Sequence, residues 1–401
     1  MSDLSGLPLP PPTGGWREGD PPGRRRWHYP EGPLPLEAGG ELPGVRLAFE
    51  TWGRLAPDRS NAVLVLHALT GDSHVAGPAG PGHPTSGWWD GLVGPGRGLD
   101  TERWFVVAPN VLGGCQGSTG PAALRPDGRG RWGGDFPFLT QRDQVVAEAD
   151  LADALGIERW ALVVGGSMGG MRAVEWAVSR PERTGALLLL ATAAAASAEQ
   201  IALAGVQLRA IRSDPHWHGG HYHDTGHAPH AGLGLARRLA HVTYRSEPEL
   251  QVRFARLPQG AEDPLAGGRY QVESYLDHQA AKLVRRFDAG SYAVLSEAMN
   301  AHDVGRGRGG VREALRRVTA PTLVAGVDSD RLYPLSQQAE LAAGIPTADA
   351  PRVVESPYGH DGFLIETEQV AALVSELVPD AVPRVRHRTA APESPQTKEH
   401  A

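Results

Sequence analysis

Short apolar runs that alternate with stretches of helical composition constrain the fold of this chain more than any other feature. The runs lie at residues 62–66, 104–108, 161–164, 186–190, 321–325 and 352–355. Their nearly continuous apolar character is typical of parallel strands that are covered by helices on both faces. The sequence therefore predicts an α/β fold with a mostly parallel sheet.

The alternation stops between residues 192 and 311, where the composition is mostly helical, as in "GLARRLAHVTY". An insertion at this point is expected above the carboxyl ends of the strands, where open α/β sheets bind ligands. We therefore expect a helical cap at 192–311 between two core segments, 40–191 and 312–382. A composition rich in Pro, Gly and Arg predicts disorder at 1–25, and the polar tail at 383–401 is also predicted to be disordered.

The charge balance argues against partners that are themselves strongly negative. The 401 residues include 39 Lys and Arg and 46 Asp and Glu, for a net charge of −7, without a long basic tract. Nucleic acid and anionic membranes are therefore not expected partners. The beginning of the sequence lacks a signal-like apolar run, and no stretch is apolar enough to span a membrane, so a cytoplasmic location is expected. The single cysteine, Cys115, agrees with a reducing compartment.

A serine between glycines follows one of the predicted strands, in "VVGGSMGGMRAVEW" at 163–176. The pattern Gly165-x-Ser167-x-Gly169 matches a nucleophile elbow, a sharp turn from strand to helix that exposes the serine hydroxyl. The glycines allow the close approach that so tight a turn needs. Ser167 is a candidate nucleophile, and it needs a base because a serine hydroxyl is almost wholly protonated at neutral pH.

Candidate partners follow Ser167 in the order that α/β-hydrolases use, an acid and then a histidine. Asp328 and Asp330 end the apolar run of "TLVAGVDSDRLYP", and His360 lies in "SPYGHDGFL" before the last predicted helix. His360 is the expected base, and one aspartate is expected to orient its imidazole. The spacing alone leaves both aspartates open.

The negatively charged oxygen that forms during acyl transfer needs backbone N–H donors. One expected donor is the amide of Met168, directly after the nucleophile, and the loop "HALTG" at 67–71 is expected to supply the other from Leu69. His67 in this loop is a rival candidate for the base, with a structural role as the alternative. Cys115 has no base beside it in the sequence, so a catalytic role for its thiol is not expected.

The sequence also resembles the homoserine O-acetyltransferases of methionine biosynthesis, which are acyltransferases with the α/β-hydrolase fold. The resemblance spans residues 47–378, and its most specific segments are "HALTGDSH", "NVLGGCQGSTGP", "GGSMGGM", "SDPHWHGGHY", "LARRLAHVTYRS", "DPLAGGRYQVESYLDHQ", "NAHDVGRGRGG", "SDRLYP" and "YGHDGF". It implies that Asp330, the aspartate of "SDRLYP", is the acid of the triad. It also implies a homodimer formed through the cap.

The same resemblance implies residues that bind the substrate. Arg237 is expected to contact the homoserine carboxylate, which suits the two-pronged guanidinium. Tyr244 is expected to lie nearby as a substrate ligand, and Asp361 to bind the substrate ammonium. Spacing alone favours a different interpretation, in which Arg237 and Arg238 lie on a solvated helix face.

Two clusters have alternative interpretations. The first is a histidine-rich run that either binds a metal or forms a polar cap loop, and it comprises His216, His218, His221, His223, His227 and His230. It lacks a carboxylate or cysteine set at clean ligand spacing, so no metal is expected. The second, "GRGRGG" at 305–310, is expected either to contact the phosphates of coenzyme A or to be a flexible connection.

Together these features predict a transferase in which Ser167 accepts an acetyl group from the co-substrate acetyl-CoA and passes it to the hydroxyl of homoserine in a ping-pong cycle. No bound cofactor is expected. The alternatives are succinyl-CoA as the donor, serine as the acceptor, a carboxylic-ester hydrolase, and a binding protein of the same fold without activity.

Overall fold

The computed structural model describes residue 11 and residues 13–378. Its main sheet has eight strands in the order β1-β4-β8-β5-β9-β10-β11-β12. Their bounds are β1 Arg26–His28, β4 Leu47–Trp52, β5 Ala62–Leu66, β8 Phe105–Pro109, β9 Leu162–Gly166, β10 Leu187–Leu190, β11 Thr322–Val327 and β12 Arg352–Val354. From β8 to β12 in this order, each strand pairs in parallel with the next, whereas β4 pairs antiparallel with both β1 and β8. The predicted α/β fold with a mostly parallel sheet is confirmed.

Helices cover both faces of this sheet. Successive side chains along a strand point to opposite sides, so a continuous apolar strand places apolar side chains on both faces, and both need to be covered. On β5, Leu64 and Leu66 belong to the core formed with α1 and α2, while Val63 and Val65 belong to the core formed with α10 and α11. The helix bounds are α1 Gln141–Ala154, α2 Met168–Ser179, α8 Val311–Leu315, α9 Leu335–Gly344, α10 Gly362–Ile365 and α11 Thr367–Leu377. Two small pairs complete the strands, β2 Leu34–Pro35 with β3 Glu41–Leu42, and β6 Val93–Gly94 with β7 Leu99–Asp100.

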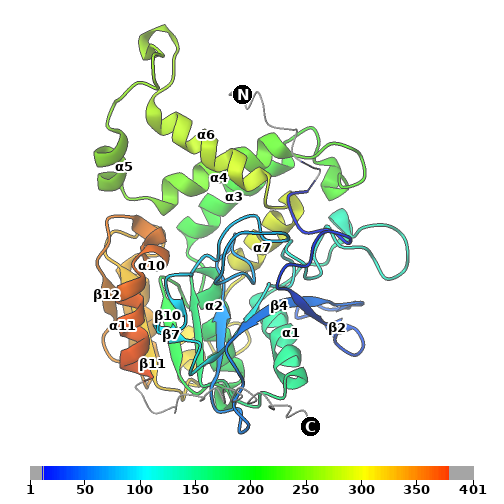
Figure 1. The fold of residues 1–401 in the computed structure, drawn as a ribbon, viewed down its shortest axis with the longest axis vertical. Helices are drawn as coiled ribbons and strands as arrows, with labels where there is room; N and C mark the ends of the chain where they lie inside the picture. The colour runs from blue at the N-terminus through cyan, green and yellow to red at the C-terminus, as the bar shows by residue number, and fades with distance from the viewer. Residues whose placement is uncertain (1–10, 12, 379–401) are drawn as a thin grey trace, which may run out of the picture.

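A helical insertion, residues 191–321, separates β10 from β11. It is described throughout, and it contains no strand of the main sheet. Its helices before α8 are α3 Ala198–Arg212, α4 His230–Tyr244, α5 Glu247–Phe254, α6 Gln271–Val284 and α7 Ala289–Asn300. Helix α4 packs against both α3 and α6 above one end of the sheet (Figure 1). Helix α4 also contacts the short turn Gly359–Asp361, which carries His360.

The predicted disorder at 1–25 is wrong for residues 13–25, which pack against the rest of the protein. Thr13 and Arg25 are buried, and the Trp16 amide donates to the Cys115 carbonyl at 2.8 Å. A Cβ atom on Gly14 would lie 2.5 Å from the Arg286 nitrogen, so this glycine permits close contact between backbones. Residues 1–10, 12 and 379–401, which include the predicted tail 383–401, lie outside the described residues.

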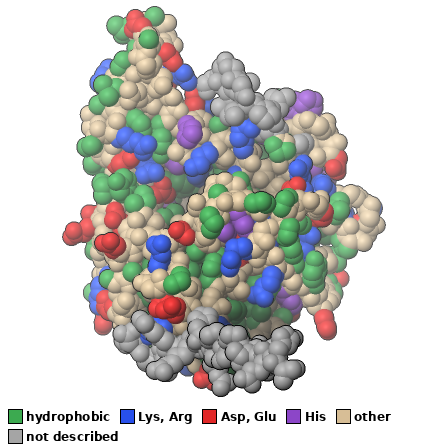
Figure 2. Space-filling model, in the orientation of Figure 1, with side chains coloured by type: hydrophobic (Ala, Val, Ile, Leu, Met, Phe, Trp, Pro, Cys, Tyr) green, Lys and Arg blue, Asp and Glu red, His purple; other side chains and the backbone are tan. Residues whose placement is uncertain are grey.

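The surface has no continuous basic stripe on the face that Figure 2 shows, where acidic and basic side chains are interspersed. Within the described ranges, no helix combines the length and the apolar character that crossing a membrane requires.

Candidate active site

Ser167 lies at the junction of β9 and α2, in a backbone conformation with φ +56° and ψ −126°. Such a conformation is strained for a residue with a side chain and is typical of functional turns. The two glycines of the motif allow it: a Cβ on Gly165 would lie 2.3 Å from the Gly169 carbonyl oxygen, and one on Gly169 would lie 2.0 Å from the Leu66 carbonyl oxygen. The predicted elbow geometry is present, and it places the hydroxyl at the carboxyl end of a central strand.

A chain of hydrogen bonds connects Ser167, His360 and Asp330, which are far apart in the sequence. The Ser167 hydroxyl oxygen lies 2.9 Å from His360 Nε2, and His360 Nδ1 lies 2.6 Å from Asp330 Oδ2. Asp330 is fixed in turn, since its Oδ1 accepts from the amides of Leu332 and Tyr333. Asp328 is exposed and accepts from backbone amides of its own loop and of the loop after β12. Of the two aspartates, the structure therefore brings Asp330 to the histidine.

The electrostatic surroundings of His360 favour its protonated form. Burial lowers the pKa of His360, but the charge and hydrogen bond of Asp330, together with the charge of Asp361, outweigh burial and raise it. An imidazole in this setting can take the proton of a serine hydroxyl, because the resulting imidazolium is stabilised by the carboxylate.

The two predicted oxyanion donors lie on either side of the elbow. Met168 is the first residue of α2, so its amide has no acceptor within the helix. Leu69 is largely buried in the loop that follows β5, and it packs in the same apolar cluster as Met168. Among the described residues, neither amide donates to a protein acceptor.

His67, the rival base, is engaged in the structure of that loop. Its Nδ1 donates to the Ala68 carbonyl at 2.8 Å, and its Nε2 accepts from the Val111 amide at 3.0 Å. Burial, reinforced by the charge of Arg172, lowers the pKa of His67 to about 3. Both ring nitrogens are therefore occupied, and the structural interpretation of His67 holds.

The predicted substrate residues lie around the histidine. The guanidinium of Arg237 lies over the Tyr244 ring, 5.6 Å from its centroid, and the centroids of the Tyr244 and His360 rings are 5.8 Å apart. Within the described residues, Arg237 has no carboxylate partner, whereas the neighbouring Arg238 pairs with Asp277 at 2.6 Å. The structure thus separates two adjacent arginines that their spacing alone could not distinguish.

Asp361 pairs with Arg245 at 3.4 Å, and sequence reasoning did not single out this arginine. Burial raises the pKa of Asp361, and the opposing charges of Arg245, His360 and Arg237 do not fully offset it. The carboxyl group therefore lies in a mainly buried position beside the histidine, where an ammonium would stabilise its ionised form.

Tyr333 is a further residue of the site that sequence reasoning missed, although it belongs to "SDRLYP". It is almost fully buried, and its ring stacks on that of His360 with centroids 4.9 Å apart. Tyr333 also lines a pocket that is partly open to solvent. The other residues that line this pocket include Leu69, Met171, Gln200, Gln207, Tyr244, Ser296, Met299 and Asn300.

The histidine-rich run forms no group of metal ligands among the described residues. His223 instead pairs with buried Asp288 at 2.9 Å, and His216 stacks on His227. Cys115 is buried, and burial raises the pKa of its thiol, so this cysteine lacks the thiolate character of a nucleophile.

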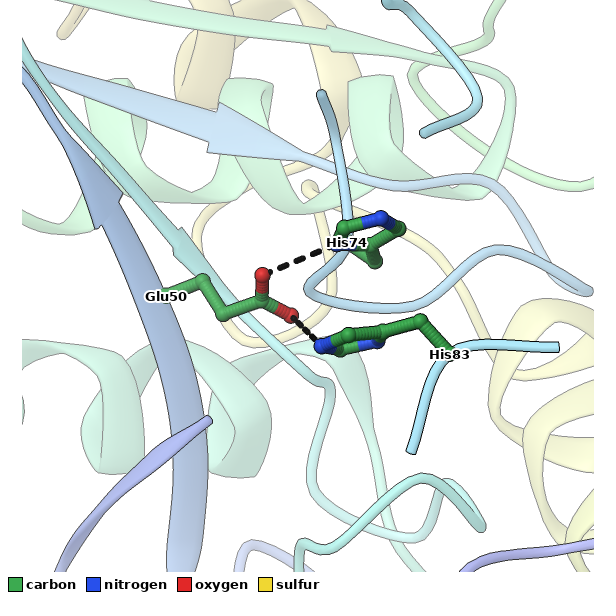
Figure 3. Close-up of side chains that lie close together, drawn as sticks. All are labelled: Glu50, His74 and His83. Atoms are coloured by element: carbon green, nitrogen blue, oxygen red, sulfur yellow. Dashed lines mark hydrogen bonds and ion pairs between the residues drawn. The ribbon is translucent and has the colours of Figure 1, made fainter. Parts of the chain in front are cut away.

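A group of possible metal ligands lies elsewhere, where Glu50 of β4 meets His74 and His83 (Figure 3). The two imidazole rings are stacked, with their centroids 3.8 Å apart and their planes inclined by 11°. The lone pair of an imidazole nitrogen lies in the ring plane, so the lone pairs of two stacked rings do not point toward one shared ion. His83 Nε2 already accepts the Arg24 amide at 2.9 Å, and His74 lies between the Glu50 carboxylate and the Pro78 carbonyl. These residues fit a buried ion pair better than a metal site.

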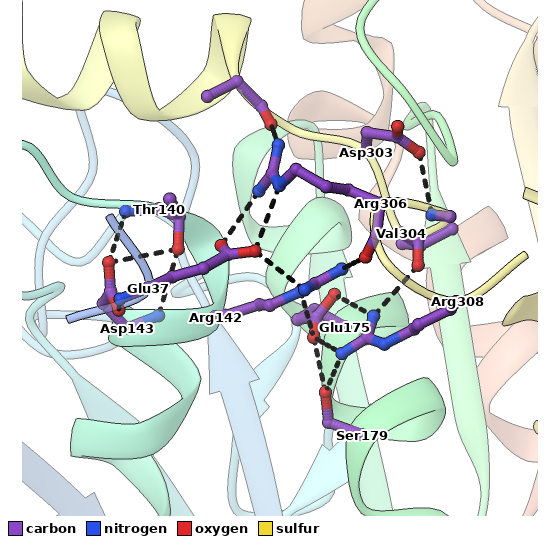
Figure 4. Close-up of polar contacts among 12 residues, drawn as sticks. Glu37, Thr140, Arg142, Asp143, Glu175, Ser179, Asp303, Val304, Arg306 and Arg308 are labelled. Carbon is purple, nitrogen blue, oxygen red and sulfur yellow. Dashed lines mark hydrogen bonds and ion pairs between the residues drawn. The ribbon is translucent and has the colours of Figure 1, made fainter. Parts of the chain in front are cut away.

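The "GRGRGG" segment connects α7 to α8, and both of its arginines are paired with acidic side chains (Figure 4). Arg306 makes two hydrogen bonds to Glu37, of 3.0 and 2.9 Å, and Arg308 bonds to Glu175 and Ser179 of α2. Arg142 of α1 bridges these groups through Glu37 and Glu175. The arginines of this segment thus have acidic partners and hold it to α1 and α2, which favours a structural connection over a phosphate contact.

Comparisons with known proteins agree with this geometry. The alpha/beta hydrolase fold family matches residues 61–367. The homoserine O-acetyltransferase of Thermobifida fusca (strain YX) is 68% identical over 379 residues, which cover 94% of this chain and 100% of that protein. The chain belongs to the homoserine O-acetyltransferase family. The family resemblance noted in the sequence is thereby confirmed.

Two solved structures place the family in a wider context. The homoserine O-acetyltransferase from Bacillus anthracis matches with a TM-score of 0.81 at 27% identity, over 90% of this chain and 98% of that one. An acetylester hydrolase from Corynebacterium glutamicum matches with a TM-score of 0.75 at 26% identity, over 88% of this chain and 96% of that one. Proteins that resemble this chain thus include an ester hydrolase as well as acyltransferases.

Proposed function

We propose that the protein transfers an acetyl group from acetyl-CoA to the hydroxyl of L-homoserine, giving O-acetyl-L-homoserine and CoA, a step of methionine biosynthesis. The hydrogen-bonded chain of Ser167, His360 and Asp330 is the observation that carries the proposal. High identity to a homoserine O-acetyltransferase over nearly the whole chain supports the choice of substrates. The reaction needs no bound cofactor.

The first half of the reaction makes an acyl-enzyme. Ser167 Oγ attacks the thioester carbon as His360 Nε2 takes the hydroxyl proton, and the negatively charged oxygen is stabilised by the amides of Leu69 and Met168. The carbon–sulfur bond then breaks, and the imidazolium returns the proton to the departing CoA sulfur. Asp330 keeps the imidazole in the tautomer that accepts a proton at Nε2.

The second half passes the acetyl group to the acceptor. His360 takes the proton of the homoserine hydroxyl, whose oxygen attacks the ester carbon, and the bond to Ser167 Oγ breaks as that oxygen regains a proton. Arg237 and Tyr244 bind the carboxylate end of homoserine, and Asp361 binds its ammonium. These groups lie close to His360, as a short amino acid with a reacting hydroxyl requires.

The decisive assay offers the purified protein acetyl-CoA or succinyl-CoA, each with homoserine, serine or water as the acceptor, and follows the release of free thiol. The proposal requires the acetyl-CoA and homoserine pair to be the most efficient. Preference for succinyl-CoA or serine would reassign the substrates on the same machinery. A rate of thiol release that does not depend on any added amino acid would favour an ester hydrolase. This alternative is tested because an acetylester hydrolase from Corynebacterium glutamicum has a similar structure.

Arg237→Ala is expected to separate the two halves of the reaction. Truncating one partner of a buried charge pair costs about 2–5 kcal/mol, hence a loss of roughly 30- to 4,000-fold in kcat/KM for homoserine. Acyl-enzyme formation should persist, because this proposal places Arg237 at the acceptor and not at the donor. Stopped-flow CoA release without homoserine, compared with steady-state transfer, measures both halves.

Neighbouring variants make this test specific. Arg238→Ala is the matched control, since Arg238 is the next residue of α4 and pairs with Asp277, so transfer should be nearly unchanged. Arg237→Lys should recover only part of the loss, because an ammonium cannot reproduce the two-pronged guanidinium geometry. Equal slowing of both halves in Arg237→Ala would assign the residue to the donor or to the fold.

A homodimer formed through the helical insertion is part of the same proposal. Apolar side chains are exposed on α3 and α4, which pack together: Ile201, Val206, Leu235 and Val242. Exposed apolar side chains on adjacent helices are available to an interface between protein chains, and a contiguous apolar patch is typical of one. We expect the double variant Val206→Glu and Leu235→Glu to sediment as a monomer, whereas the unaltered protein sediments as a dimer. A monomeric parent protein would refute the dimer without affecting the assigned chemistry.

A further inference from the structure

Arg286, which lies between α6 and α7, holds the backbone of the loop that follows β5. Both of its terminal nitrogens donate to the carbonyl oxygen of Thr70, Nη1 at 2.8 Å. Thr70 directly follows Leu69, whose amide is the proposed oxyanion donor. A residue of the helical insertion therefore binds the loop two peptide units after that donor.

The opposite end of the loop is fixed by the core. Arg172 of α2 donates to the His67 carbonyl at 2.7 Å, and the Gly71 amide closes a turn onto the Ala68 carbonyl at 2.9 Å. Leu69 thus lies between an anchor in the core and an anchor in the insertion. Its own amide has no protein acceptor among the described residues and remains available to a substrate oxygen.

Arg286 is itself held in place from several directions. Its carbonyl accepts from Gln116 Nε2 at 2.7 Å, and Gln116 Oε1 in turn accepts from Arg25 at 3.0 Å. Asp72 lies 3.8 Å from the Arg286 guanidinium. Although burial raises the pKa of Asp72, the charges of Arg286 and Arg25 outweigh it and lower that pKa, so the carboxylate stays charged beside its cation.

We propose that Arg286 is a positioning residue of the oxyanion hole, which fixes the Leu69–Thr70 backbone so that the Leu69 amide meets the developing negative charge. This inference rests on the proposed function, since it assumes an acyl-enzyme reaction at Ser167. Oxyanion donors act only within about 2.7–3.1 Å of the reacting oxygen, so small displacements are costly. Because the same hole serves the formation and the breakdown of the acyl-enzyme, Arg286 has to affect both.

The test uses Arg286→Met, which keeps an unbranched apolar stem and removes the donors of the guanidinium. We expect kcat to fall on the order of 100-fold in each half-reaction, the size of effect that a misplacement of about 1 Å produces, with little change in KM for homoserine. Arg286→Lys should recover part of the rate, because an ammonium can donate to a single carbonyl oxygen. Arg253→Met on α5 is the control, since Arg253 is half exposed and, among the described residues, its ion pair is with Glu249.

A second measurement separates positioning from mere stabilisation. A trifluoromethyl ketone, which forms a tetrahedral oxyanion on Ser167, should lose affinity for Arg286→Met by about the same factor as kcat, while O-acetylhomoserine should bind unchanged. A variant with native kcat, or a loss confined to KM for homoserine, would overturn the inference. If Arg286→Met does not fold, Arg286→Lys decides alone: a kcat and a ketone affinity that both equal those of the parent protein would refute it.

The same variants can be assayed by hydrolysis of p-nitrophenyl acetate, which needs the oxyanion hole but neither homoserine nor CoA. If the parent protein does not acetylate homoserine, the proposed function fails, and the effect of Arg286→Met on ester hydrolysis still tests the inference. If the parent acetylates homoserine and Arg286→Met hydrolyses the ester at the full rate, only the inference fails.

Discussion

Ser167→Ala is expected to lose nearly all turnover, by about 10⁶-fold in kcat, as happens when the nucleophile of a serine triad is removed. The parent protein mixed with acetyl-CoA alone should gain one acetyl mass on the peptide that contains Ser167, and the variant should gain none. Intact-protein and peptide mass spectrometry after rapid acid quench measure both. The elbow should survive the substitution, because alanine removes only the hydroxyl.

Cys115→Ala is the matched control for this labelling. Cys115 is the single cysteine of the chain and the other conceivable acyl acceptor, but its thiol is buried and its pKa is raised. The control should retain both the label and the activity. An acetyl group found on Cys115, or labelling that persists in Ser167→Ala, would remove Ser167 from the mechanism.

The central strands could be predicted from the sequence because burial on both faces leaves a local pattern of continuous apolar residues. Strands β1 and β4 were missed because they lack a continuous apolar pattern. They pair antiparallel at one side of the sheet, and β4 contains buried Glu50, whose charge interrupts the apolar pattern. Partners brought from another part of the chain, including Ser73, His74 and His83, make burial of this carboxylate possible.

The segment at 13–25 shows how composition can mislead. Pro and Gly indicate disorder when no partner is known, yet Gly14 and Gly15 are the residues that let this backbone lie against Arg286 and Cys115. Such contacts depend on surfaces formed by distant residues, and no local pattern records them. The same applies to Arg306 and Arg308, whose acidic partners lie more than a hundred residues away.

The triad could be proposed because each member directly follows an apolar run and the order is that of a known fold. Arg286 and Tyr333 could not be found in this way. Arg286 binds the backbone of a distant loop, and Tyr333 contacts His360 through its ring. Neither contact produces a characteristic spacing in the sequence. The resemblance supplied Arg237, and among the described residues Arg238 pairs with Asp277 whereas Arg237 has no carboxylate partner.

Asp330→Asn is expected to lower kcat on the order of 10⁴-fold, as when the acid of a serine triad is neutralised. The amide would no longer hold His360 in the tautomer that accepts the Ser167 proton. Because Asp330 raises the pKa of His360, its removal should also lower that pKa, and the acidic limb of kcat/KM should move to lower pH. A pH–rate profile of the variant measures both effects.

Asp328→Asn is the matched control, since Asp328 lies two residues away in the same loop and accepts only from the amides of Ser329 and Ser356. An asparagine oxygen can still accept from these amides, so we expect a small loss of rate and no shift of the acidic limb. Equal losses in the two variants would mean that both carboxylates serve His360 or that the loop has collapsed. Thermal melting distinguishes these outcomes, because a collapsed loop would lower the Tm, whereas shared catalysis would leave it unchanged.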